Sequence, residues 1–214
     1  MPKSSAYRPP RTEERLILVD EEDKDVGIAE KHAAHRKGLL HRAFSIFLFD
    51  EAGRVLLQRR ARGKYHSAGL WANACCGHPR PSEAIGAAAT RRLHEELGLC
   101  APLSLGFHAR YFSALDCGMV ENEFVHVFGG SLPVGPIQPN PDEADAVELV
   151  GLKELQKQVV RSPERYAYWL RHYLREHGDQ VLAMRDLLCS DRTPHALRYR
   201  HAASASSAAP PSDS

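Results

Sequence analysis

The sequence has 214 residues, of which 43% are hydrophobic and 26% are charged, and its formal net charge is +1. These proportions are typical of one globular domain with a hydrophobic core, and the near-zero charge argues against binding to nucleic acid or to an anionic membrane. No segment approaches the roughly 18 apolar residues of a transmembrane helix, and the N-terminal segment lacks the apolar run of a signal peptide. We therefore expect a cytoplasmic protein, a monomer or weak dimer, without nucleic-acid or membrane partners.

The N-terminal part of the chain predicts an arm followed by strands. Residues 1–13 are polar and contain prolines, which is typical of a flexible arm, and the compact domain is expected over 14–188. The apolar run 16–19 predicts a strand that ends at an acidic turn. Segments 43–49 and 54–60 predict a hairpin, because Asp50-Glu-Ala-Gly53 between them is a turn sequence.

The stretch NACCGHP, residues 73–79, contains two of the five cysteines. It begins within a strand predicted over 71–76 and extends beyond the end of that strand. The sequence has no C-x-x-C pair, and a reducing compartment favours free thiols over disulfides. A metal site, a reactive thiol and ordinary strand packing remain the alternatives for this stretch. The cysteines are Cys75, Cys76, Cys100, Cys117 and Cys189.

The clearest predicted helix covers residues 82–97. Ser82 is its expected N-cap and Gly98 its expected C-terminal stop, and apolar residues recur at every fourth position from Ile85 to Leu97. Such an apolar stripe predicts one buried face and one solvent-facing face.

The C-terminal part mixes strands and helices. Strands are predicted over 121–128 and 147–149, a loop over 133–141, helices over 152–160, 163–175 and 181–188, and a low-complexity, disordered tail over 189–214. This mixture indicates an α+β fold, or a sheet with helices on both faces.

The helix around residue 90 carries a recognisable motif. Residues 77–99 read GHPRPSEAIGAAATRRLHEELGL, and eight of the nine defined positions match the Nudix box, G-x5-E-x7-R-E-U-x-E-E-x-G-U. Clustered carboxylates on such a helix can hold Mg²⁺ against a diphosphate, whereas the plainer interpretation is a charged surface helix. The resemblance implies an α/β fold, the Nudix-type α/β/α sandwich with a mixed sheet.

One position departs from that box. Where Nudix hydrolases carry a glutamate, this chain has Arg92, which removes a metal ligand and adds a phosphate-binding cation. Arg92 and Glu96 are four residues apart and share one helix face. This face is therefore better suited to binding a diphosphate with one Mg²⁺ than to cleaving it.

Three further motifs narrow the resemblance. EKHAAH at residues 30–35 precedes His41 by the family spacing, NACCGHP follows, and VENE at 120–123 comes after Tyr111. Together with the altered helix, these motifs resemble the type I isopentenyl-diphosphate isomerases over roughly residues 14–175. The resemblance implies metal-dependent interconversion of isopentenyl and dimethylallyl diphosphate by protonation and deprotonation. The alternatives are a Nudix diphosphate hydrolase and a non-catalytic Nudix binding module.

The resemblance also implies metal sites. A first cation, Mn²⁺, Mg²⁺ or Zn²⁺, is expected at His35, His41, His78, Glu121 and Glu123. Glu96 is expected to bind a second cation, a Mg²⁺ that bridges the diphosphate, with Glu95 as a second choice. The other histidines are expected to be structural or surface residues: His32, His66, His94, His108, His126, His172, His177, His195 and His201.

The implied chemistry divides between the two ends of the substrate. Cys76 and Glu123 are the expected acid–base pair, with Tyr111 supporting Glu123, while strand alternation turns Cys75 to the opposite face as a packing residue. Trp169 is expected over the developing carbocation, and Trp71 is expected to line the same pocket. The small-molecule diphosphate is expected to bind Lys31, Arg60, Lys64 and Arg92. The family aromatic and proline of the preceding loop are replaced by Ser67 and Ala68.

Overall fold

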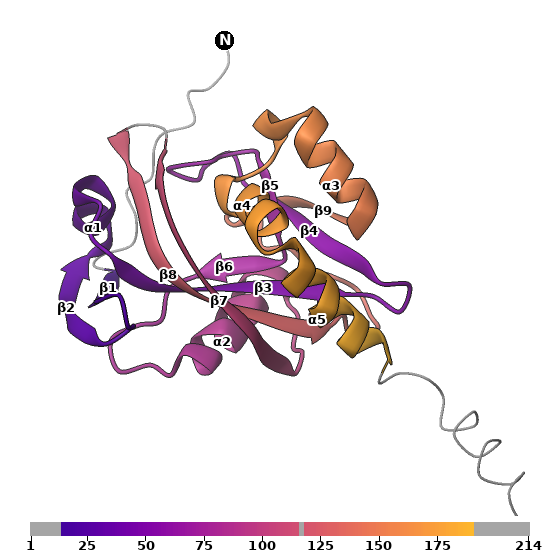
Figure 1. Cartoon of the computed structure of the whole chain (residues 1–214), viewed down its shortest axis with the longest axis horizontal. Helices are drawn as coiled ribbons and strands as arrows, with labels where there is room; N and C mark the ends of the chain where they lie inside the picture. Colours follow the sequence, from indigo (N-terminus) through magenta and orange to yellow (C-terminus); the bar gives the residue numbers. More distant parts are fainter. Residues whose placement is uncertain (1–13, 116–117, 191–214) are drawn as a thin grey trace, which may run out of the picture.

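The computed structural model describes residues 14–115 and 118–190, so the predicted arm and nearly all of the predicted tail lie outside the described residues. Helices lie on both sides of a central mixed sheet (Figure 1). The strands are β1 Arg15–Val19, β2 Asp25–Glu30, β3 His41–Phe49, β4 Arg54–Arg60, β5 Trp71–Asn73, β6 Cys75–Gly77, β7 Leu103–Ala114, β8 Val120–Ser131 and β9 Ala144–Gly151. The helices are α1 Lys31–Lys37, α2 Ile85–Leu97, α3 Leu152–Arg161, the 3-10 turn η2 Pro163–Arg165, α4 Tyr168–Glu176 and α5 Gly178–Ser190.

Strand β3 is the centre of the sheet. It pairs antiparallel with β1, β4 and β6 and parallel with β8, and nearly all of its side chains are buried. A strand that is covered on both faces is expected to be a nearly continuous apolar run, which explains the sequence AFSIFLF, interrupted only by Ser45. On its other edge, strand β8 pairs antiparallel with β7 along most of its length. Strand β9 pairs antiparallel with β4.

Two hydrophobic cores lie on opposite faces of this sheet. One packs Phe47, Val127 and the apolar faces of α3, α4 and α5, and the other packs Phe44, Ile46 and the apolar face of α2. Helix, sheet and helix layers are the arrangement of a Nudix α/β/α sandwich, so the predicted fold class is confirmed.

The predicted hairpin is also confirmed. Strands β3 and β4 are joined by a turn in which the Asp50 carboxylate accepts the amide hydrogens of Ala52 and Arg54. Gly53 has a φ of 71°, a left-handed conformation that favours glycine. The helices predicted over 152–160 and 181–188 are present, although α5 runs two residues past the predicted end of the domain.

Several boundaries were predicted wrongly. Ser82 is not the N-cap of α2: the helix begins at Ile85, and Ser82 lies in a left-handed turn with φ 67°. That turn lets the Glu83 carboxylate accept hydrogen bonds from the Arg80 amide and the Arg91 side chain. The predicted strand 71–76 is two strands, because β5 pairs with β4 whereas β6 pairs with β3.

The predicted helix 163–175 is interrupted as well. After η2 the chain extends at Tyr166, which bridges Trp71, and the Ala167 amide donates to the Trp71 carbonyl at 2.9 Å. This extended step turns α4 back over the sheet, so that Trp169 reaches the pocket described next.

Candidate active site

A pocket lies beside the start of β3, and its walls come from both ends of the chain. Four of the predicted site residues do not line it: His35 and His41, which are fully buried, Trp71, and the second-choice Glu95. Helix α2 and strand β4 supply one end of the lining, whereas strands β6, β7 and β8 and helix α4 supply the other. The pocket therefore joins the Nudix helix to the histidine motif.

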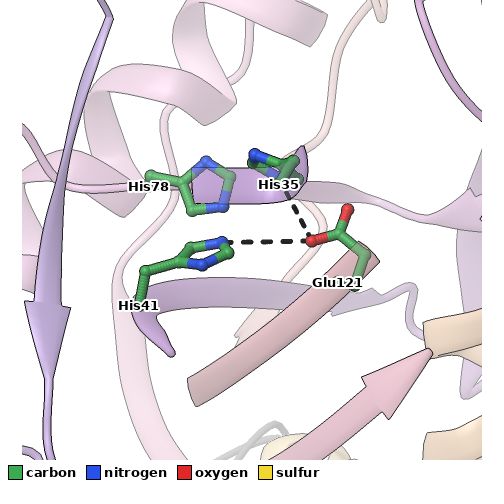
Figure 2. A group of neighbouring side chains, drawn as sticks. All are labelled: His35, His41, His78 and Glu121. Atoms are coloured by element: carbon green, nitrogen blue, oxygen red, sulfur yellow. Dashed lines mark ion pairs between the residues drawn. The ribbon is translucent and has the colours of Figure 1, made fainter. Parts of the chain in front are cut away.

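Three histidines and a glutamate converge behind this pocket (Figure 2). One ligand atom from each of His35, His41, His78 and Glu121 lies within 4.8 Å of all the others. Glu121 Oε2 is 3.3 Å from His35 Nε2 and 4.0 Å from His41 Nε2. Glu123 adjoins the group, with Oε1 2.9 Å from His78 Nε2 and 3.6 Å from His41 Nε2.

Local backbone structure orients two of these rings. Helix α1 is a short element, begun by Glu30, whose carboxylate accepts two amide hydrogens, and ended by Gly38 with a φ of 61°. His35 Nδ1 lies 2.7 Å from the Lys31 carbonyl, and His41 Nδ1 lies 2.8 Å from the Leu39 carbonyl. Carbonyl oxygens only accept, so both rings carry their proton on Nδ1 and present the Nε2 lone pair to the group.

The donor set fits a divalent cation. Among the described residues, His35 Nε2, His41 Nε2 and Glu121 Oε2 are buried without a hydrogen-bond partner, and each such atom costs about 1–3 kcal/mol when left unsatisfied. Imidazole and carboxylate donors suit borderline first-row metals and Mg²⁺. A metal can therefore satisfy three buried polar atoms at once.

A thiol and a carboxylate face the same pocket. Cys76 Sγ lies 3.2 Å from Ser45 Oγ, its cross-strand partner on β3, and 3.5 Å from Asn73 Oδ1. Burial raises the pKa of Cys76 to about 12, so this side chain is a thiol at neutral pH. Cys75 is fully buried on the other side of the sheet in the core beneath α2, as strand alternation predicts.

Glu123 is held from two directions. It lies opposite Tyr111 in the β7–β8 pair, and the Tyr111 hydroxyl donates to its Oε2. Burial acts to raise the pKa of Glu123, but contacts with His41 and Tyr111 outweigh burial and hold that pKa below its ordinary value. The pocket therefore combines a protonated thiol with an ionised carboxylate.

The other end of the pocket is rich in cations, and Lys31, Lys64 and Arg92 each pair with a carboxylate. Arg92 contacts Glu96 at 2.6 Å and Glu143 at 3.0 Å, and Lys64 contacts the same Glu143 at 2.5 Å. Lys64 and Arg92 hold the pKa of Glu143 at about 2, although burial acts to raise it. Lys31 pairs with Glu14 at 2.7 Å.

The aromatic lining is partly as expected. Trp169 is buried, the Arg60 guanidinium lies 5.2 Å from its ring centre, and its indole Nε1 has no hydrogen-bond partner among the described residues. Trp71 does not line the pocket and instead lies 5.7 Å from the Arg59 guanidinium. The expectation for Trp71 was therefore wrong, since its side chain packs against the hydrophobic core instead.

Sequence reasoning missed His66 in the pocket wall and Glu143, a carboxylate that pairs with two of the pocket's cations. His66, expected to be structural or on the surface, is buried in the pocket wall with Nε2 3.4 Å from Glu121 Oε1, and burial lowers its pKa to about 3. Glu143 follows the loop predicted over 133–141 and pairs with Lys64 and Arg92. Neither residue belongs to a spaced motif, so only the folded chain reveals them.

Comparisons with known proteins show the family of the chain. The NUDIX domain family matches residues 39–173. The chain is 50% identical to isopentenyl-diphosphate Delta-isomerase 2 of Aromatoleum aromaticum, over 82% of this chain and 90% of that protein. It is 45% identical to the isopentenyl-diphosphate Delta-isomerase of Burkholderia multivorans, over 79% and 96% respectively. The chain therefore belongs to the Nudix family and, within it, to the isopentenyl-diphosphate Delta-isomerases.

Solved structures support the fold alone. The protein DR0079 of Deinococcus radiodurans superposes with a TM-score of 0.63 at 19% identity, over 76% of this chain and 98% of that one. The MutT protein of Methanosarcina mazei gives a TM-score of 0.55 at 18% identity, over 66% and 94%. Among the described helices, none is both long and apolar enough to cross a bilayer.

Proposed function

We propose that the protein is an isopentenyl-diphosphate Delta-isomerase, which interconverts isopentenyl and dimethylallyl diphosphate. One observation carries the assignment of roles: the thiol of Cys76 and the carboxylate of Glu123 line the same pocket, next to a cluster of cations. A double-bond shift needs a proton added at one end of the allylic unit and another removed at the opposite end. Membership of the isomerase family supports the same reaction.

The diphosphate is proposed to bind at the cationic end. Arg60 and Arg92 offer planar donor forks and Lys31 and Lys64 offer point charges for phosphate oxygens. Arg92 stands where Nudix hydrolases carry a glutamate, so the helix binds phosphate with one carboxylate fewer for metal. When bound, Mg²⁺ at Glu96 would neutralise the diphosphate, and Mn²⁺, Mg²⁺ or Zn²⁺ at the His/Glu group would hold Glu121 and Glu123.

The hydrocarbon end is proposed to lie between Cys76 and Glu123. The Tyr111 hydroxyl donates a hydrogen bond to Glu123 Oε2. Through this contact Tyr111 either relays the proton that Glu123 transfers or holds the carboxylate in place. The indole of Trp169 would face the tertiary carbocation formed by protonation and stabilise it by a cation–π contact. The buried walls exclude water, which would otherwise trap that cation.

A Nudix hydrolase is the principal alternative, and one incubation separates the two reactions. The protein is mixed with isopentenyl diphosphate in D₂O, and the products are followed by proton and phosphorus NMR. We expect deuterated dimethylallyl diphosphate without released phosphate. Phosphate release without double-bond migration would overturn the isomerase assignment, and absence of both would favour a binding module.

The setting of the protein is proposed in the same way. We infer a cytoplasmic monomer or weak dimer acting on a small-molecule diphosphate, without nucleic-acid or membrane partners, as one domain over 14–188. The four cysteines within the described residues are free, which fits a reducing compartment.

A further inference from the structure

The loop between β4 and β5 places a buried histidine in the pocket wall. His66 is 7% exposed and its neighbour Ser67 is 5% exposed. Ser67 has a φ of 49°, a left-handed conformation that costs a non-glycine residue roughly 1–2 kcal/mol. The loop is closed at its base by the Gly69 amide, which donates to the Arg60 carbonyl at 2.9 Å. A surface loop thus adopts a strained backbone next to the residue that it buries.

The two nitrogens of His66 have different surroundings. Nδ1 lies 3.4 Å from Ser67 Oγ, a hydroxyl that can donate to it. Nε2 lies 3.4 Å from Glu121 Oε1. A neutral ring that accepts at Nδ1 carries its proton at Nε2, the nitrogen that lies near the carboxylate.

The two oxygens of Glu121 are thereby given separate tasks. Oε1 faces His66, whereas Oε2 faces His35 and His41 and has no hydrogen-bond partner among the described residues. A carboxylate that is fixed through one oxygen presents the other in a single orientation, and such outer contacts change metal affinity by roughly 10–100-fold.

The rest of the His66 ring is enclosed by aromatic and histidine rings. Trp169 lies perpendicular to it with centroids 6.0 Å apart, and His35 stacks at 6.1 Å. The Arg60 side chain donates to the His66 carbonyl at 3.3 Å. These contacts leave the imidazole little freedom to turn away from Glu121.

We propose that His66 is a positioning residue for the His/Glu metal site, holding Glu121 so that Oε2 is free to bind a divalent cation. The inference rests on the proposed function, because that function assigns the cation to this group. It adds a fourth histidine, which acts through Glu121 rather than as a ligand.

Metal affinity tests the inference without reference to turnover. Full-length protein is stripped with a chelator and titrated with Mn²⁺ or Zn²⁺ against a chromophoric chelator. We expect His66→Ala to bind the metal about 10–100-fold more weakly. His66→Gln, whose side-chain amide can donate to Glu121 in place of Nε2, should stay within about threefold of the unchanged protein. His108→Ala, at an exposed histidine of β7, is the matched control and should not change affinity.

The possible outcomes distinguish failure of the His66 positioning role from failure of the proposed metal site. Unchanged affinity in His66→Ala would overturn the positioning role while leaving the metal site intact. Equal weakening in both His66 variants would overturn the proposal that a donor at Nε2 holds Glu121. If the unchanged protein binds no metal, the metal site of the proposed function fails with it. Thermal melting of the stripped proteins identifies a variant that is merely unfolded, and His66→Gln then decides alone.

Discussion

Adjacent cysteines on β6 allow a test in which the two variants differ only by one position. Cys76 faces the pocket, whereas Cys75 is fully buried beneath α2. Replacing Cys76 by alanine removes a proposed proton-transfer group, and such groups contribute about 10²–10⁴-fold to rate. We therefore expect kcat to fall by at least about 100-fold in Cys76→Ala.

The cost of each change to stability follows from its contacts. Cys76 makes two polar contacts, with Ser45 and Asn73, so its loss should lower the free energy of unfolding by about 1 kcal/mol. Cys75→Ala deletes a fully buried sulfur and leaves a small cavity, which should cost about 1–2 kcal/mol. Its kcat should remain within about threefold of the unchanged protein, because its side chain does not reach the pocket.

The measurement combines double-bond migration by NMR with chemical denaturation of each variant. A large loss of turnover confined to Cys76→Ala, with both variants folded, is the expected result. Equal loss of turnover from both would show that strand alternation does not divide their roles. A loss below tenfold in Cys76→Ala would remove the thiol from the proposed chemistry.

Three further predictions concern metals and charge. Treatment with EDTA should abolish turnover and added Mn²⁺ or Mg²⁺ should restore it, whereas full activity in metal-stripped protein would contradict the His/Glu site. Glu143→Gln removes the charge that orients Lys64 and Arg92, so KM for the diphosphate should rise about 5–50-fold with kcat less affected; an unchanged KM would refute that role. Hydrogen bonds from Arg91 and the Arg80 amide hold the pKa of Glu83 at about 2. The stabilisation by Glu83 is therefore full above about pH 4.5 and lost as pH falls toward 2. Denaturation profiles of Glu83→Gln should lose this acid-side dependence, and a profile parallel to the unchanged protein would refute it.

The features that sequence predicted well are local in the chain. The Nudix helix and the histidine and VENE motifs each place chemical groups at short, fixed spacings, and the sheet only has to bring the motifs together. Strand β3 was predictable because it is a nearly continuous apolar run. Glu143 belongs to no spaced motif and to no apolar run, so its pairing with Lys64 and Arg92 could not be predicted and is seen only in the folded chain.

The features that were missed have physical reasons. Strand β7 alternates buried and exposed residues, but its buried set includes Ala109 and Ser113, so its hydrophobic alternation is weak. Helix α1 has seven residues, too few for a helical period, and depends on the Glu30 cap and on Gly38. His66 has no sequence signal because its burial follows from the loop conformation at Ser67 rather than from periodicity.

The parallel pairing of β3 with β8 has a consequence for how the protein acquires activity. His41 and Glu123 lie in register on this pair although they are far apart in sequence. Parallel strands cannot be joined by a tight turn, and contacts between distant segments form slowly because long loops must close first. During refolding the helices can form before β3 and β8 pair, that is, before His41 and Glu123 are brought together. We therefore expect turnover to return only when the central sheet has closed, later than the recovery of helical structure.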